Sequence, residues 1–200
     1  PRLSAPANHV KAVRLTQAML KELGVDTVYL QQCMVPHWVR GNKEQDEILF
    51  TGNTKFQLHL TALGNSVATI PAGISAPVLE VRSMNELKSL GEAVVKGKII
   101  FFNFKMNPTY IETFRAYGES GVSRVKGPSI AAKYRAIGAI VRSLAINLND
   151  YPHTGVTIYN DSFPKIPAVA ISTNDAEYLS RELMKKNVSK VWFNKWQDAS

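Results

Sequence analysis

Apolar and polar residues follow two different periods near the start of the chain. Over residues 8–23 the apolar side chains recur at helical spacing, which predicts an amphipathic helix that ends at Gly24. Over residues 25–35 apolar and polar side chains alternate, which predicts a long strand with Cys33 buried and chemically inert. The polar, charged stretch over residues 40–47 is the predicted domain boundary.

Beyond this boundary the apolar runs are shorter, and turn-forming residues separate them. The predicted strands cover residues 47–50, 56–60, 77–81, 98–102, 139–141, 166–171 and 188–193, and the predicted helices cover residues 85–90, 127–137 and 172–186. Each of the last two helices lies between two strands, which predicts crossovers between parallel strands. The fold class is therefore predicted as α/β (mixed α+β), with a β-sheet core covered by helices.

The stretch over residues 138–172 is the centre of this pattern. Two apolar runs of strand type, at residues 139–141 and 166–171, flank a long connection that holds His153 among turn-forming residues. The runs have the composition of buried strands and the connection has that of a displayed loop. Two roles are open for His153 on this evidence, an anchor of the loop or a contact to a substrate.

Composition is that of a globular chain. It has 200 residues, of which 45% are apolar and 20% are charged, enough to bury a core and too balanced for global disorder. The apolar runs are too short to span a membrane. The single cysteine excludes an internal disulfide and a metal site built from several cysteines.

The net charge of +8 is concentrated over residues 96–142, where nine basic residues stand against Glu112 and Glu119 with aromatic residues between them. This composition has two readings, a solvated face or a binding surface for an acidic peptide, a glycan or nucleic acid. The first is favoured over nucleic acid because no nucleic-acid motif accompanies the charge.

A search for catalytic spacing finds none. The four histidines, at positions 9, 37, 59 and 153, have no acidic or histidine partner at metal-ligand spacing. No nucleophile elbow and no nucleotide-binding glycine pattern occurs, and Gly118, Gly121 and Gly127 are interpreted as a flexible loop before a helix. We therefore predict no catalytic residue and no metal ligand within the chain.

An ordered set of short blocks nevertheless resembles one family, the carboxypeptidase Q-like (plasma glutamate carboxypeptidase-like) zinc exopeptidases. No single block is specific to this family, but the order of the blocks along nearly the whole chain is specific. The blocks are Pro1-Arg2-Leu3-Ser4, the helix ending at Gly24, and residues 34–41, 63–67, 95–103, 138–143, 152–155 and 165–171.

The resemblance implies a domain division. Residues 1–48 would be a helix and strand of the peptidase domain, residues 49–193 the protease-associated domain, and residues 194–200 the return towards the catalytic domain. In that family the zinc ligands lie mostly downstream of the protease-associated insert. The chain would then hold no cofactor, zinc would belong to the parent protein, and the chain alone would not be an enzyme.

The resemblance also implies a role and partners. The domain would cover the active-site cleft of a secreted, extracellular or periplasmic exopeptidase and aid recognition of a peptide substrate. Its partners would be its own catalytic domain and the substrate, with a homodimer of the parent as one option. The cleft-facing candidates are Asn103, Arg142, His153 and Tyr159, and Arg142 could attract a substrate carboxylate or form a surface salt bridge. The alternative function is a free-standing module that binds an acidic peptide, a glycan or nucleic acid.

Overall fold

A computed structural model describes residues 7–34, 38, 45–50 and 55–194. The chain divides into two compact units, Pro1–Val39 (unit 1) and Arg40–Ser200 (unit 2). The division falls at the start of the polar stretch that was predicted as the boundary. Residue 35 of the predicted strand over residues 25–35, and residues 195–200 of the predicted return over residues 194–200, lie outside the described residues.

Unit 1 contains one helix, α1 (Ala7–Glu22), as predicted. Gly24 lies two residues after the helix, and its φ of +79° suits a residue without a β-carbon. The amide of Gly24 donates to the carbonyl of Lys21, and that of Val25 donates to Leu20, so the last turn closes in a Schellman motif.

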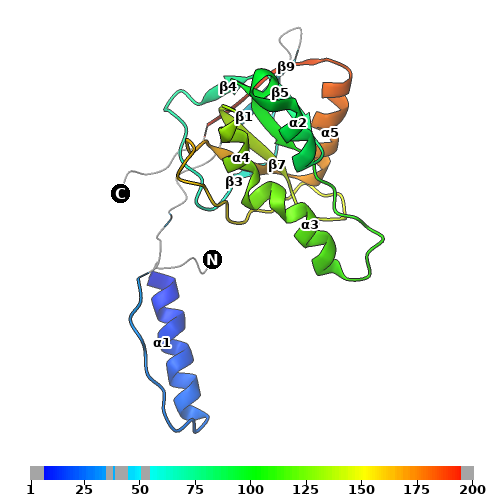
Figure 1. The fold of residues 1–200 in the computed structure, drawn as a ribbon. Helices are drawn as coiled ribbons and strands as arrows, with labels where there is room; N and C mark the ends of the chain where they lie inside the picture. Colours follow the sequence, from blue (N-terminus) through cyan, green and yellow to red (C-terminus); the bar gives the residue numbers. More distant parts are fainter. Residues whose placement is uncertain (1–6, 35–37, 39–44, 51–54, 195–200) are drawn as a thin grey trace. The chain divides into compact units, whose positions relative to one another are not determined.

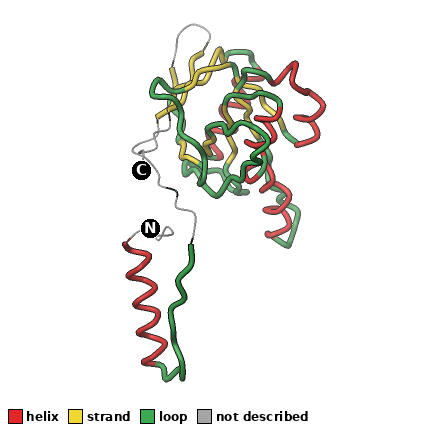
Figure 2. Tube along the Cα trace, turned by 60° about the vertical axis from the view of Figure 1, so that its left-hand side comes forward, coloured by secondary structure: helices red, strands yellow, loops and turns green. Residues whose placement is uncertain are grey.

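The predicted strand over residues 25–35 was wrong for its described part. Residues 25–34 run alongside α1 as an irregular segment without strand assignment (Figures 1 and 2). A strand exists only where a neighbouring strand pairs with it, and the described part of unit 1 supplies none. Cys33 is consequently exposed rather than buried, which corrects the second prediction for this segment.

Unit 2 is built on a five-stranded sheet in the order β3-β8-β7-β6-β5. Its strands are β3 (Leu60–Ala62), β5 (Val78–Val81), β6 (Ile99–Phe102), β7 (Gly138–Arg142) and β8 (Ala168–Ile171). Strands β5 to β8 are parallel, and β3 is antiparallel to β8. The three strands β6, β7 and β8 are buried along their whole length, as their continuous apolar sequences require.

A second, four-stranded sheet has the order β2-β1-β9-β4. Its strands are β1 (Gln45–Phe50), β2 (Lys55–Phe56), β4 (Ile74–Ala76) and β9 (Val188–Asn194). Strand β9 pairs antiparallel with both β1 and β4. The second predicted parallel crossover is therefore wrong, because the strand that follows the last helix joins a different sheet.

The five-stranded sheet is the central layer of unit 2, and alternate residues of its strands enter two cores. Ile100 and Phe102 face a core shared with helices α2 (Met84–Val95) and α4 (Gly127–Lys133). Ile99 and Phe101 face a second core shared with helix α5 (Thr173–Met184) and the four-stranded sheet. The predicted mixed α+β class is confirmed (Figure 1).

Several element boundaries differ from prediction. Helix α3 (Thr113–Val125) replaces the predicted loop and contains Gly118 and Gly121. Helix α2 is interrupted at Gly91, whose φ is +62°, so its first part agrees with the helix predicted over residues 85–90, and its continuation to Val95 was not predicted. Helix α4 ends at Lys133, and the predicted strand over residues 56–60 is divided between β2 and β3. Strand β4 lies in a region predicted as turns.

Candidate functional site

The carboxyl ends of the parallel strands gather polar side chains at one edge of the central sheet. Asn103 directly follows β6, and Arg142 is the last residue of β7. Because β6 and β7 are adjacent and parallel, these two side chains meet, with Arg142 Nη1 donating to Asn103 Oδ1 over 3.2 Å. Ligand sites of open α/β sheets lie at this edge, so we define these residues and their neighbours as the carboxyl-edge site.

Arg142 is buried and forms an ion pair within the chain. Its Nη1 lies 2.7 Å from Oε1 of Glu177 on α5, and its side chain is only 4% exposed. Lys105, whose side chain is 59% exposed, lies 2.6 Å from the same carboxylate oxygen. Burial acts to raise the pKa of the Glu177 carboxyl, but the Lys105 hydrogen bond and the Arg142 charge together hold that pKa below its usual value.

A second carboxylate joins this network. Glu80 of β5 accepts hydrogen bonds from Asn103 Nδ2 at 2.8 Å and from Ser180 Oγ at 2.9 Å. Arg82 Nε also donates to Glu80, at 3.1 Å. A cavity of ≈ 510 Å³ opens at this edge. Its lining residues are Arg82, Asn103, Lys105, Glu177, Ser180 and Met184.

The loop over residues 152–155 joins the same edge through its backbone. The amide of His153 donates to Ser143 Oγ at 2.7 Å, one residue after Arg142, and Thr154 Oγ1 donates to the carbonyl of Ala62. The His153 side chain is exposed. Gly155 packs on the guanidinium of Arg124 from α3, where an added β-carbon would lie 2.5 Å from Cζ. The loop is thus fixed by its main chain and displays its imidazole.

Tyr159 is not part of this group. Its hydroxyl donates to the carbonyl of Ile166, which precedes β8 and therefore lies at the amino edge of the parallel strands. Burial raises the pKa of the Tyr159 phenol, against the opposing effect of hydrogen bonds with Ser66 and Val67. Of the four predicted cleft residues, the structure brings Asn103, Arg142 and the His153 loop together and places Tyr159 at the opposite edge.

The charged partners at this site were missed by the sequence analysis. Glu177 and Glu80 were not singled out, because charged residues on a covering helix or a strand end carry no local motif. The partner of His59 was missed too: its amide and its Nδ1 both lie within hydrogen-bond distance of Asp175 Oδ2, at 2.6 and 3.1 Å. One signal was available, since Asp175 and Glu177 open the helix that directly follows a buried strand.

The arrangement can hold and orient a charged group but shows no means of catalysis by itself. The two carboxylates of the network are each bound to cations or amide donors, which keeps them from acting as free bases. Among the residues that the structure describes, no group of three or more His, Cys, Asp or Glu side chains could hold a metal ion. No helix within the described ranges is long and apolar enough to cross a membrane.

Five of the nine basic residues over 96–142 are paired or buried within the chain. Lys105 and Arg142 pair with Glu177, Arg115 pairs with Glu119, and Arg135 pairs with Glu92. Arg124 is buried against Tyr117. This pairing weakens the alternative reading as a module for acidic ligands, because an electrostatic binding surface needs exposed, uncompensated charge.

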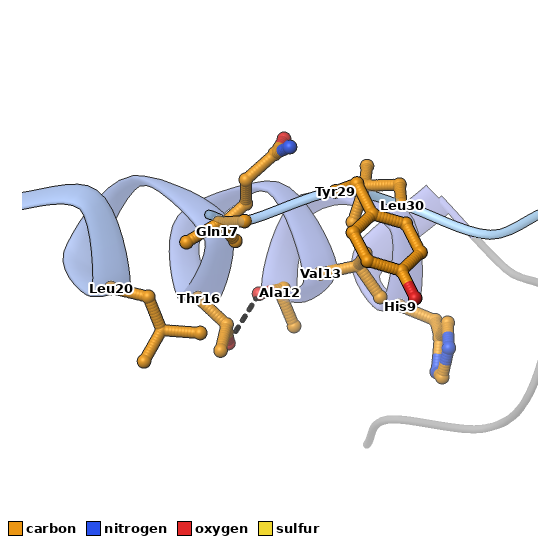
Figure 3. Close-up of a pocket in the computed structure, with 9 residues that line it drawn as sticks. His9, Ala12, Val13, Thr16, Gln17, Leu20, Tyr29 and Leu30 are labelled. Carbon is orange, nitrogen blue, oxygen red and sulfur yellow. Dashed lines mark hydrogen bonds between the residues drawn. The ribbon is translucent and has the colours of Figure 1, made fainter. Parts of the chain in front are cut away.

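Unit 1 contains a separate groove between α1 and the segment over residues 25–34. Figure 3 shows Val13, Thr16 and Leu20 of the helix along it, with Tyr29 and Leu30 across from them. Its volume is ≈ 520 Å³. Thr16 Oγ1 donates to the carbonyl of Ala12 within the helix, so this hydroxyl is already used. Apolar side chains of α1 beside the groove remain exposed, among them Val13 and Leu20.

Comparison with known proteins finds similar sequences over most of the chain. No protein-family model matches it. Carboxypeptidase Q from Mus musculus is 34% identical over 187 residues, which are 94% of this chain and 37% of the relative. Carboxypeptidase Q from Xenopus laevis is 37% identical over 180 residues, or 90% of this chain and 36% of the relative. The chain thus spans little more than a third of the length of these relatives.

Solved structures of peptidases are also similar to the chain. A peptidase M28 precursor from Shewanella amazonensis superposes with a TM-score of 0.89 at 30% identity, covering 98% of this chain and 43% of the other. An aminopeptidase from Aneurinibacillus sp. superposes with a TM-score of 0.63 at 17% identity, covering 98% of this chain and 40% of the other. The second likeness concerns the fold alone.

Proposed function

We propose, from the premise that the chain is a homologue of carboxypeptidase Q, that it forms the non-catalytic N-terminal part of a zinc exopeptidase. The homology confirms the resemblance predicted from the sequence blocks, and it relates the chain to peptidases. In this proposal unit 2 is the protease-associated domain, and unit 1 is the first piece of the peptidase domain. Their function is to cover the active-site cleft and to help position a peptide substrate.

The observation that carries this proposal is the pairing of the first and last strands of unit 2. Strands β1 and β9 are antiparallel neighbours, with Gln45 opposite Asn194. The chain therefore enters and leaves unit 2 at the same place. A domain with this property can be inserted into another without separating the two points of attachment, as expected for an insert within a peptidase domain.

Unit 1 supports the same proposal because it has no core of its own. The apolar side chains that were predicted to form the packing stripe of the first helix are exposed, namely Val10, Val13, Leu20 and Leu23. Every buried core side chain of the described residues lies from Ile48 onward. A helix of this kind is stabilised mainly by packing of its apolar face, so we propose that the remaining peptidase domain covers it.

For substrate recognition we propose the carboxyl-edge site. Lys105 and Asn103 line its cavity, and Arg142 and Asn103 hold Glu177 and Glu80 in place beside it. The displayed His153 would extend this surface. The hydrogen bond of Tyr159 to Ile166 supports a role for Tyr159 in holding the loop rather than in meeting the substrate.

The parent protein would supply the chemistry. Its zinc, held by residues outside this chain, would activate a water molecule for attack on a peptide bond near a free terminus. The described residues offer no such metal site, so we assign no step of the reaction to them. A secreted location belongs to the same proposal and rests on the homology.

The test begins with the reading frame. We expect it to continue past Ser200 into a metal-binding peptidase region, and the complete protein to hydrolyse dipeptides with zinc. Replacing residues 45–194 by a short turn should leave a folded protein with lower kcat/KM. Zinc-dependent turnover by the 200-residue chain alone, or a frame that stops at Ser200, would overturn the proposal.

A further inference from the structure

Helix α3 and the loop before it expose large apolar side chains. Ile111 is 99% exposed and Phe114 is 89% exposed, while Tyr117 is 38% exposed. Phe114 and Tyr117 are three residues apart, a spacing that places side chains on the same helix face. The opposite face of α3 is buried through Ala116 and Ser120. The helix therefore has one buried face of small side chains and one face whose bulky apolar side chains are exposed to solvent.

Further apolar residues lie beside this helix. Val125, at the end of α3, accepts hydrogen bonds at its carbonyl from the amide of Ile158 and from Thr157 Oγ1. Val156 and Ile158 are each more than half exposed. We define Ile111, Phe114, Tyr117, Val156 and Ile158 as the α3 surface. Figure 1 shows α3 at the margin of unit 2, away from the β1–β9 end of the fold.

Two charged groups near this surface, Arg115 and Glu119, have partners within the chain. Arg115 lies 3.8 Å from Glu119 and stacks 4.3 Å over the ring of Tyr110, whose hydroxyl donates to Glu119. Exposed apolar residues beside a polar rim with internal partners are typical of a protein–protein contact. An acidic ligand has no free cation to bind here among these residues.

We propose that the α3 surface docks against the peptidase part of the same polypeptide. This inference rests on the proposed function and adds the surface by which the domain is held. The occupant follows from length: carboxypeptidase Q relatives have 63% of their length outside the matched region, and the superposed Shewanella structure has 57% outside. A covalently attached partner is present at high effective concentration, which favours it over a separate protein.

Docking at the α3 surface would also affect the loops beside the carboxyl-edge site. Arg124 belongs to α3, stacks near Tyr117, and supports Gly155 of the displayed loop. Met106 and Leu144 pack on Ala116 of the same helix, next to the segments that carry Asn103 and Arg142. A partner that fixes α3 therefore fixes both loops that flank the carboxyl-edge site.

Hydroxyl-radical footprinting of the complete protein against the 200-residue chain tests this contact. We expect the oxidation rates of Ile111, Phe114 and Tyr117 to fall several-fold in the complete protein. Val94 on α2, 37% exposed and so matched to Tyr117, should oxidise equally in both. A Phe114→Asp variant should restore the rates at positions 111 and 117 and leave the unfolding midpoint of the 200-residue chain unchanged.

The possible outcomes distinguish a failure of the docking contact at the α3 surface from a failure of the proposed function. Protection of Met19 on α1 without protection of the α3 surface would overturn this inference and leave the proposed function standing. Loss of protection at both places would overturn both, as would a reading frame that ends at Ser200. Protection that increases with protein concentration would assign the surface to a second copy of the chain and overturn the contact proposed here.

Discussion

Gly155 lies directly on the guanidinium of Arg124. A β-carbon at Gly155 would stand 2.5 Å from both Cζ and Nε of that arginine. Arg124 is buried, and its Nη2 donates to the hydroxyl of Tyr117. The Pro152–Gly155 loop and helix α3 are thus joined at a point that only glycine can occupy without displacing a buried cation.

Gly155→Ala should therefore destabilise unit 2 by about 1–3 kcal/mol, the usual cost of overpacking a filled site. Gly118→Ala is the matched control, because an added β-carbon there meets nothing within 4 Å and lies on helix α3. The control should gain about 0.5–1 kcal/mol, since alanine restricts the unfolded chain. Urea unfolding of the two variants measures the difference, and equal midpoints would contradict the packing described.

Arg142 and Lys105 contact the same carboxylate oxygen of Glu177, so the contributions of the two cations to stability can be compared directly. Arg142→Ala should lower the free energy of unfolding by about 1–3 kcal/mol, because the ion pair of a buried arginine is broken and Asn103 loses a donor. Lys105→Ala should cost only about 0–1 kcal/mol, because that contact is exposed to water. Chemical denaturation of both variants provides the measurement. A larger loss of unfolding free energy for Lys105→Ala than for Arg142→Ala would contradict this assignment of the buried and the exposed contact.

Glu177 should make stability depend on pH. Its pKa is lowered in the folded chain from the ordinary value of 4.5, so folding favours the ionised form. The resulting stabilisation is fully present above that ordinary value and is lost as pH falls through the lower folded-state pKa. The advantage of the native chain over Glu177→Gln should therefore shrink as pH falls below the ordinary pKa of 4.5. Unfolding curves that stay a constant distance apart over this range would rule the effect out.

Removal of unit 1 should leave unit 2 folded. The buried core of the described residues begins at Ile48, so a chain of residues 40–200 retains every member of it. We expect its urea midpoint to match that of the full 200 residues, with lower self-association because the exposed apolar face of α1 is gone. Circular dichroism and sedimentation velocity report the two quantities. A marked fall in the midpoint would mean that unit 1 contributes to the fold of unit 2.

The sequence predicted best where structure is determined locally. Strands β6, β7 and β8 are continuous apolar runs between turn residues, and Ser172 caps α5 by accepting a hydrogen bond from the Asp175 amide. Helix α3 escaped prediction because its buried face consists of small or polar residues, among them Ala116, Ser120 and Ser123. Such a face gives no apolar period, and two glycines suggest a loop instead.

Long-range pairing could not be predicted. Strand β9 joins β1 across most of the chain, and β4 is three residues long in a glycine- and proline-rich stretch. At the site, Asn103 and Arg142 were singled out and do meet. Glu177, the partner of Arg142, comes from a helix far along the chain, and no spacing rule connects it to that residue.

The same strand pairing has a consequence for the order of folding. Strands β5 to β8 pair with their neighbours in sequence, so each can join as soon as it and its connecting segment exist. Strand β1 is made first, yet its main partner β9 comes at the far end of the unit. Closing so long a loop is slow, and until then β1 has only the two-residue strand β2 to pair with. We expect the four-stranded sheet to form last, and with it the point at which unit 2 is attached.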